Sequence, residues 1–425
     1  MFSRLHNRLR RPEHYGLVML IVTTAAAGFA MSAQGTVVAN YFADELGLAG
    51  PQFGYITAIR EIPGFLLIFL TALFYRLSLP HLTAGALLLL SVGYGLFGWS
   101  TSFWTVAPWV ILSSVGYHTW LQTQYALGMS LTTESRAGRV LGLISSVNNA
   151  GSLAAMLVVA VAFQSGLLTY RSTFVLCGAL ALIAALAIVR FPRMRDGKLE
   201  SQPQERERVP LLTGIRNAIV LRREYRYYYL LSLLDGGRQQ IFFSFGLWVL
   251  VSRYGLEVPA ISAILIAVTA LNTVLGAWIG RLFDRYGEKP LLAAVNVGYV
   301  VALAGYALVD NVVAAVLCYV IYSLIFPVSG IGAATYLRKV AVADELAPSL
   351  AMGVTLQHAA AIVVPVATGV VLNYVGYQIP FLVACGFACL TFLATQRLAP
   401  ERQKSPRRLA EEARLAASAA GGSQE

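Results

Sequence analysis

Charged residues are scarce in this chain. Of its 425 residues only 12% are Asp, Glu, Lys or Arg, whereas 57% are hydrophobic. A soluble chain of this length needs a larger polar surface, so the composition excludes an ordinary soluble globule and predicts an integral membrane protein. Polar residues do not recur at every second position of the apolar runs, which excludes barrel strands and favours helices.

Cysteine and nucleotide-binding motifs are also scarce. The four cysteines, Cys177, Cys318, Cys385 and Cys389, lie inside apolar runs, so we expect core residues with no disulfide and no metal site. No phosphate-binding Gly-x-x-x-x-Gly-Lys-Ser/Thr loop is found, which argues against ATP hydrolysis by this chain. No nucleophile with a base stands at a consistent depth either. We therefore expect no enzyme activity and no cofactor.

Long apolar runs fill the rest of the sequence. A helix needs about 20 apolar residues to cross the hydrocarbon core of a bilayer. The sequence predicts an all-α membrane protein with twelve such helices, near residues 16–43, 53–75, 82–101, 107–131, 139–164, 172–190, 227–252, 259–280, 290–309, 312–337, 350–374 and 379–396.

The basic residues are sorted between the two sides of the membrane. If the N-terminus is cytoplasmic, 28 of the 32 Lys and Arg residues fall in the termini and in the loops on that side. This positive-inside bias predicts cytoplasmic termini in the plasma (inner) membrane and explains the net charge of +11 without a nucleic-acid partner. The first apolar run is longer than the core of a signal peptide, so we interpret it as a retained span.

A hydrophilic segment divides the spans into six and six. We predict an N-terminal half at 1–190, a cytoplasmic linker at 191–226, a C-terminal half at 227–396 and a cytoplasmic tail at 397–425. The sequence GLAGP at 47–51 matches GLEVP at 255–259, each after the first span of its half. The two halves are therefore predicted to be pseudo-symmetric repeats related by an axis along the membrane normal.

The loop between the eighth and ninth spans carries a recognisable motif. Its sequence GRLFDRYGEKP, Gly280 to Pro290, resembles the G-x-L-x-D-R-x-G-x-K/R signature of the major facilitator superfamily. Gly280 permits close helix approach, Gly287 permits a tight turn, and Asp284 can accept hydrogen bonds. Arg285 suits an anionic membrane surface. We expect these residues to form a gate that Asp284 helps to close. The equivalent first-half stretch, ALFYRLSLPHL, lacks the acid.

Charged residues inside the predicted spans are the strongest candidates for function. Such residues are costly in a bilayer and usually mark a substrate or proton site. Arg60 and Glu61 lie in the second span, and Asp235 and Arg238 lie one turn apart in the seventh. Because adjacent residues point about 100° apart on a helix, we expect Arg60 and Glu61 to have different partners. Glu61 has no base one turn away, so it should look to another helix.

Polar side chains at similar depth, roughly 10–17 Å from a membrane face, complete the candidate site. We assign proton coupling to Glu61 and Asp235, and prefer Glu61 because Arg238 persistently compensates Asp235. The candidate substrate contacts are Arg60, His118, Gln122, Asn148, Arg238, Gln239, Gln357 and His358. Interhelical hydrogen bonds would explain many of the neutral ones equally well.

These features favour a monomeric secondary transporter that works by alternating access in membrane lipid. Two buried arginines suit a small anionic or zwitterionic organic solute, because guanidinium binds carboxylate or phosphate bidentately. Protons are the expected coupling ion. Two alternatives stay open: efflux of hydrophobic or cationic drugs and metabolites, and a non-transporting receptor. The fifth span lacks the glycine-proline motif of many drug antiporters, which weakens the efflux alternative.

The charge sorting makes a prediction about topology. Single cysteines introduced in the linker or at either terminus should resist a membrane-impermeant thiol reagent in sealed cells and react after permeabilisation. A cysteine in the 165–169 loop should react in both preparations. Labelling of the linker in sealed cells would contradict the topology.

Overall fold

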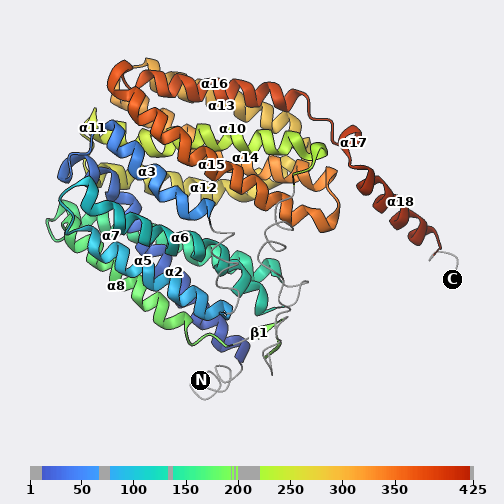
Figure 1. The fold of residues 1–425 in the computed structure, drawn as a ribbon, viewed down its shortest axis with the longest axis horizontal. Helices are drawn as coiled ribbons and strands as arrows, with labels where there is room; N and C mark the ends of the chain where they lie inside the picture. The colour runs from blue at the N-terminus through green and yellow to red at the C-terminus, as the bar shows by residue number, and fades with distance from the viewer. Residues whose placement is uncertain are drawn as a thin grey trace. The chain divides into compact units, whose positions relative to one another are not determined.

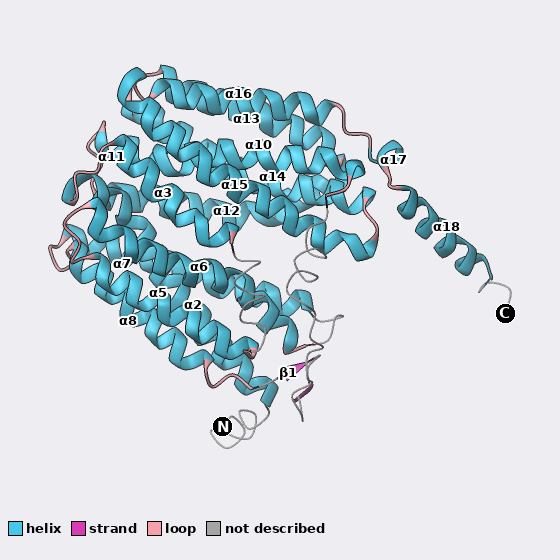
Figure 2. Ribbon diagram, viewed as in Figure 1, coloured by secondary structure: helices cyan, strands magenta, loops and turns pink. Residues whose placement is uncertain are grey.

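The computed structural model describes residues 12–66, 77–132, 137–192, 194–195, 198–199 and 221–421, and these are almost entirely helical (Figures 1 and 2). The exception is a pair of two-residue antiparallel strands, β1 (Met194–Arg195) and β2 (Lys198–Leu199), in the predicted linker. The remainder of the linker lies mostly outside the described residues.

Six helical segments match the six predicted spans of the first half. They are α2 (Pro12–Asn40) with the π-helix η1 (Tyr41–Glu45), α3 (Gly50–Phe65), α5 (Leu79–Phe97), α6 (Phe103–Ser130), α7 (Ala137–Gln164) and α8 (Tyr170–Ile188).

The second half has a corresponding set, preceded by the 3-10 turn η3 (Arg223–Tyr225). It comprises α10 (Arg226–Gln240) with η4 (Ile241–Phe245) and α11 (Gly246–Ser252), then α12 (Val258–Tyr286), α13 (Glu288–Leu308), α14 (Val312–Val340), α15 (Ala343–Val375) and α16 (Gln378–Gln396). The short helices α17 (Pro400–Gln403) and α18 (Pro406–Gly421) form the tail.

Nine helical segments of the described residues are long and apolar enough to cross a membrane. The three predicted spans outside this set are α3, α6 and α10–α11. The described α3 has only 16 residues, α6 carries several polar side chains, and α10 of the seventh span carries Asp235, Arg238 and two glutamines. These three segments also carry most of the charged candidates. The fold is consistent with twelve spans.

The chain divides into two compact units that exchange a segment. The first unit contains Met1–Val209 and Leu247–Thr273, and the second contains Pro210–Gly246 and Val274–Glu425. The boundary at Gly246 directly follows η4. Within the first unit, the Asn40 side chain donates to the Leu256 carbonyl at 2.9 Å, and the rings of Phe53 and Trp248 lie 5.8 Å apart. The domain boundaries at 190, 226 and 396 stay a prediction.

The internal repeat is visible in the backbone. Gly47 and Gly255, the glycines matched by GLAGP and GLEVP, both have positive φ, 57° and 65°. The amide after each glycine donates to a carbonyl six residues earlier, Leu48 to Phe42 and Leu256 to Leu250. Both helices thus end at an equivalent turn that needs a left-handed residue, a conformation that glycine adopts without strain.

Small residues set the helix packing of the first unit. A Cβ on Gly178 of α8 would lie 2.8 Å from the Cα of Gly95 on α5, so the two backbones touch. The Ser91 hydroxyl of α5 donates to the Gly178 carbonyl at 2.7 Å. Close approach through glycine is the usual way in which helices associate in a membrane, where no water is released by apolar contact.

Aromatic side chains pack the second unit around α10 and η4. Phe242 stacks on Tyr322 of α14 with ring centroids 3.6 Å apart, and Tyr319 lies on the same ring at 5.1 Å. The Tyr306 hydroxyl of α13 donates to the Gly246 carbonyl at 2.7 Å. Contacts of the second unit therefore reach Gly246, the last residue of the seventh span that belongs to this unit.

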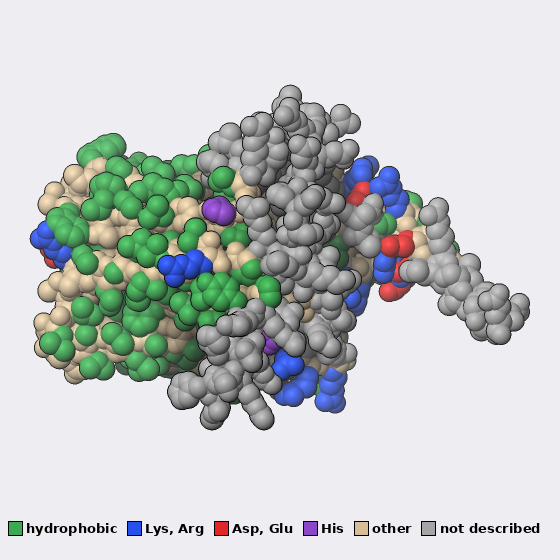
Figure 3. All heavy atoms as spheres, turned by 90° about the horizontal axis from the view of Figure 1, so that it is seen from below, with side chains coloured by type: hydrophobic (Ala, Val, Ile, Leu, Met, Phe, Trp, Pro, Cys, Tyr) green, Lys and Arg blue, Asp and Glu red, His purple; other side chains and the backbone are tan. Residues whose placement is uncertain are grey.

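The described surface matches a membrane environment. On the face in Figure 3, hydrophobic side chains are spread widely over the coloured area, and charged side chains gather mainly toward the right-hand side. Exposed aliphatic residues such as Val161, Val274 and Leu393 would be costly in water but are stable against lipid.

The glycine contact predicts a stability difference. Gly178→Ala should lower the melting temperature of the purified protein in detergent, because overpacking costs about 1–3 kcal/mol. Gly85→Ala on α5 is the matched control, since a Cβ there meets nothing within 4 Å and alanine favours the helix. Equal melting temperatures for the two variants would show that the α5–α8 contact does not limit stability.

Candidate functional site

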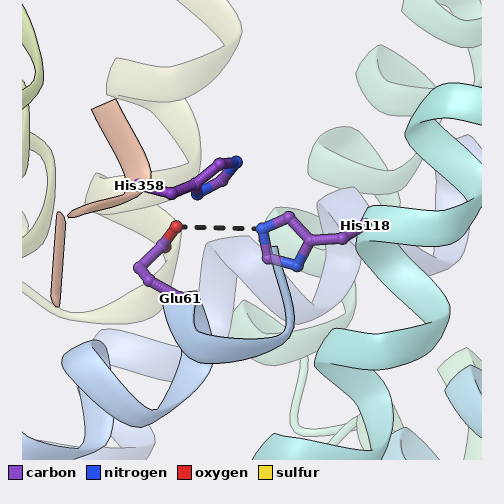
Figure 4. Close-up of side chains that lie close together, drawn as sticks. All are labelled: Glu61, His118 and His358. Atoms are coloured by element: carbon purple, nitrogen blue, oxygen red, sulfur yellow. Dashed lines mark ion pairs between the residues drawn. The ribbon is translucent and has the colours of Figure 1, made fainter. Parts of the chain in front are cut away.

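The first charged group lies between α3 and α6 of the first unit. Glu61 is buried, and its Oε1 accepts hydrogen bonds from Arg60 Nη2 at 3.0 Å and Nε at 3.2 Å. Its Oε2 lies 3.7 Å from Nε2 of His118, also buried (Figure 4). One carboxylate thus faces a guanidinium on one side and an imidazole on the other.

This geometry corrects one expectation and confirms another. The prediction that Arg60 and Glu61 have different partners is wrong, because they pair with each other. The long arginine side chain bends back along the helix and overcomes the 100° separation of the two Cβ directions. The expectation that Glu61 looks to another helix is confirmed by its ion pair with His118 on α6.

The hydrogen bonds around His118 fix its tautomer. Its Nδ1 lies 3.0 Å from the Ser114 carbonyl oxygen, which can only accept, and 3.0 Å from the Ser114 hydroxyl. That hydroxyl donates its hydrogen to the Arg60 carbonyl. Nδ1 must therefore carry a hydrogen, and Nε2 is the ring nitrogen that faces Glu61. Ser114 was not among the predicted residues.

Local backbone chemistry helps to join these helices. Pro63 lies inside α3 and has no amide hydrogen, so the helix loses one internal hydrogen bond. Ser114 of α6 reaches the Arg60 carbonyl three residues before this proline. The bond links the charged turn of α3 directly to α6.

The second charged group lies inside the second unit. Arg238 has no exposed surface, and its Nη2 donates to Asp235 at 2.6 Å. Its Nη1 donates to the Tyr322 hydroxyl at 2.7 Å, and its guanidinium carbon lies 3.5 Å from the centre of the Tyr299 ring. Nε has no hydrogen-bond partner among the described residues. The predicted Asp235–Arg238 pair is present, and the two tyrosines were not predicted.

Two glycines next to Asp235 on α10 allow neighbouring helices to approach closely. A Cβ on Gly236 would lie 2.8 Å from the Cα of Gln357 on α15, and one on Gly237 would lie 3.1 Å from the Phe387 ring on α16. Both glycines stay within the regular α10 helix. Their role is therefore close helix approach in the second unit.

The neutral candidates occupy more open positions. Asn148 is half-buried, and its side-chain oxygen would lie 2.8 Å from a Cβ on Gly28 of α2. Gln122 on α6 is exposed, whereas Gln239, Gln357 and His358 are half-buried. Their assignment as substrate contacts stays a prediction.

The signature loop is described in part. Gly287 has φ 75° and forms the N-cap of α13, as a tight turn requires, and Arg285 is exposed. The surroundings of Gly280 and the side chain of Asp284 lie outside what the structure describes, so the gate stays a prediction.

Two residues at the end of the loop hold it in place, and neither was among the predicted site residues. Glu288 is buried and pairs with Lys339 at the end of α14 at 2.7 Å. Lys289 donates to the Gln396 carbonyl at the end of α16 at 2.7 Å. The loop is therefore tied to two other helices of its own unit.

The family is shown by comparison with known sequences. The profile of the Major Facilitator Superfamily matches residues 20–355. The chain belongs to this superfamily. No curated protein sequence matches it. The family places it among transmembrane transporters rather than enzymes.

Solved structures of this superfamily share the fold. The nucleoside transporter NupG is 17% identical with a TM-score of 0.72, and the match covers 90% of this chain and 100% of NupG. A bacterial homologue of the human lysosomal transporter Spinster, in an inward-facing and occupied conformation, is 13% identical with a TM-score of 0.68, covering 92% and 98%. The human organic anion transporter MFSD10 is 12% identical with a TM-score of 0.57, covering 90% and 99%.

A further carboxylate, Glu345, was not among the predicted site residues. Glu345, near the start of α15, is buried and accepts from Arg222 Nη2 at 2.6 Å, Arg407 Nη1 at 2.9 Å and the Tyr225 hydroxyl at 2.9 Å. Burial raises the pKa of Glu345, but the hydrogen bonds from Arg222 and Tyr225 and the two positive charges outweigh it and hold that pKa below its ordinary value. Burial and the same carboxylate raise the pKa of Tyr225 to about 12.

The lowered pKa of Glu345 predicts a pH dependence of stability. A depressed folded-state pKa stabilises the fold above the ordinary glutamate value, and this contribution is lost as the pH falls through the folded-state pKa. The melting temperature of the wild type should exceed that of Glu345→Gln at pH 7, and the difference should shrink below about pH 4.5. A difference that stays constant down to pH 3 would contradict the assignment.

Proposed function

We propose that the protein is a secondary active transporter that moves a small anionic or zwitterionic organic solute by alternating access, coupled to protons. The observation that carries this proposal is the Glu61–His118 pair, an acid and a base held 3.7 Å apart on two helices of one unit. We place the protein in the plasma (inner) membrane with cytoplasmic termini, as the basic residues indicate.

The pair is suited to hold one exchangeable proton. With Nδ1 of His118 committed to Ser114, an unprotonated Nε2 would direct a lone pair at the Glu61 carboxylate. A proton on either group removes that repulsion, and Arg60 contacts the opposite carboxylate oxygen. A change in the Arg60–Glu61 contact would then alter how strongly the pair holds its proton.

Arg60 is the arginine better placed to bind substrate. Its side chain is 49% exposed, whereas that of Arg238 is completely buried and already contacts Asp235, Tyr322 and Tyr299. A substrate carboxylate or phosphate could compete with Glu61 for the Arg60 guanidinium. Substrate binding and proton affinity would be coupled through that shared guanidinium. The proposed anionic class rests on Arg60 and not on the likeness to MFSD10.

The exchange of a segment between the units supports alternating access. Residues 247–273 belong to the first unit although the preceding part of the seventh span belongs to the second. The Asn40–Leu256 and Phe53–Trp248 contacts hold them there. In the proposed cycle these few contacts break when the opposite face opens.

The substrate can be sought by thermal shift. A ligand at 100 times its dissociation constant stabilises the folded protein by about 2.7 kcal/mol, which raises the melting temperature measurably. Organic anions and zwitterions should raise it for the wild type and less for Arg60→Gln. A screen in which only cationic or neutral apolar compounds stabilise the protein would favour drug efflux instead.

The coupling prediction uses the substrate found in this way. In proteoliposomes, Glu61→Gln should abolish accumulation driven by a pH gradient and retain exchange of labelled substrate, because a glutamine side chain cannot take up or release a proton. Asp235→Asn is the matched variant: it leaves Arg238 unpaired in the core, so it should cost about 3–5 kcal/mol of stability. In whatever folded fraction remains, coupling should persist.

Three results would contradict these assignments. Uphill accumulation by Glu61→Gln would exclude Glu61 as the coupling acid. A wild type that ignores the pH gradient would exclude proton coupling altogether. Saturable binding without exchange would identify a receptor.

A further inference from the structure

Two arginines from opposite ends of the second unit share one carboxylate. Oε1 of Glu345 accepts from Nε and Nη2 of Arg222 and from Nη1 of Arg407. Arg222 directly precedes η3, and Arg407 belongs to the tail helix α18. Beside them, the Ser405 amide donates to the Val340 carbonyl at 3.1 Å, which fixes the start of α18 against the end of α14. The position of Arg407 is therefore built into the fold.

The acid of this group is buried, and its two arginines are largely exposed. The side chain of Glu345 is 10% exposed, whereas those of Arg222 and Arg407 are 50% and 67% exposed. One carboxylate neutralises only one of the two guanidinium charges. Within the described part of the chain, the remaining N–H groups of the two arginines make no other side-chain hydrogen bond, so these donors are available at the surface.

Two more arginines extend this charge. Arg223 and Arg226 are exposed, and no ion pair involves either one among the described residues. Arg226 follows η3 as the first residue of α10, four residues after Arg222. We call Arg222, Arg223, Arg226 and Arg407 the arginine cluster. Among the side chains that the structure describes, the acids within or beside it are Glu345 and the exposed Glu224.

The neighbouring acids of the tail do not cancel the surplus. Glu412 binds Lys404 at 2.9 Å and Arg408 at 3.2 Å, and Glu411 binds Arg408 at 2.9 Å. Glu401 also binds Lys404, at 2.7 Å. Because these acids are engaged with their own bases, four arginines face two glutamates at the cluster.

We propose that the arginine cluster is a binding site for the phosphodiester headgroup of an anionic phospholipid. Guanidinium N–H groups match phosphate oxygens bidentately. Arg226 is the first residue of α10 and directly precedes the predicted seventh span, so the cluster lies at the level where lipid headgroups meet the protein, beside Tyr227. This position favours a lipid over free phosphate. The site is independent of the proposed transport cycle.

The test measures lipid binding to the purified full-length protein by native mass spectrometry. Phosphatidylglycerol should bind more tightly than phosphatidylcholine. The double variant Arg223→Gln/Arg226→Gln should weaken phosphatidylglycerol binding about fivefold for each arginine removed. Because neither arginine pairs with a described carboxylate, its melting temperature without lipid should match the wild type. Arg407→Gln should weaken binding as well.

The matched control is Arg171→Gln, which removes an exposed arginine from the start of α8 in the first unit. It should leave the affinity of the cluster unchanged. Equal affinity of the double variant and the wild type would overturn the proposal, as would equal binding of the two lipids. Inorganic phosphate that displaces the lipid at comparable concentration would show a free-anion site and overturn the lipid assignment.

Discussion

A guanidinium with no exposed surface is the main constraint on the second unit. Several kcal/mol are needed to take such a charge out of water, and neighbouring groups must return that energy in the folded state. Asp235 returns it through charge, Tyr322 through its hydroxyl and Tyr299 through its ring face. Because these residues come from α10, α13 and α14, the three helices can form this core only in one mutual register.

The first unit treats its charges differently. Glu61 also has an arginine beside it, but that arginine is half exposed, and the other partner, His118, is an imidazole on a different helix. The buried Asp235–Arg238 pair is shielded from solvent, whereas the half-exposed Arg60 of the other pair can respond to solvent and ligands. The asymmetry between the two groups is the physical reason to place exchangeable chemistry in the first unit and a permanent support in the second.

Much of the architecture followed from local pattern. Apolar runs predicted the helices, and GLAGP and GLEVP predicted equivalent turns because a left-handed glycine ends both helices. Glu61 could be expected to seek another helix because it has no base one turn away. The partners of the buried charges were harder to predict. Tyr299 and Tyr322 are two of 21 tyrosines, and Glu345 binds residues more than 60 positions away in either direction, so only the folded chain brings them together. Arg60 was misjudged because Cβ direction does not determine where a long side chain ends.

The three predicted spans that fall outside the apolar set have a consequence for synthesis in the cell. During membrane insertion each segment is first tested by its own partition energy, and a charged residue at the centre of a helix costs about 2.5–3.5 kcal/mol. α3 and α10 carry such residues, and α6 has a chain of polar ones. These helices should leave the insertion machinery together with apolar neighbours, α6 beside α5 and α10 beside the later α15 and α16 that pack on it. The helix that carries Arg238 should then stay beside the insertion machinery until α15 and α16, near the end of the second unit, have been synthesised.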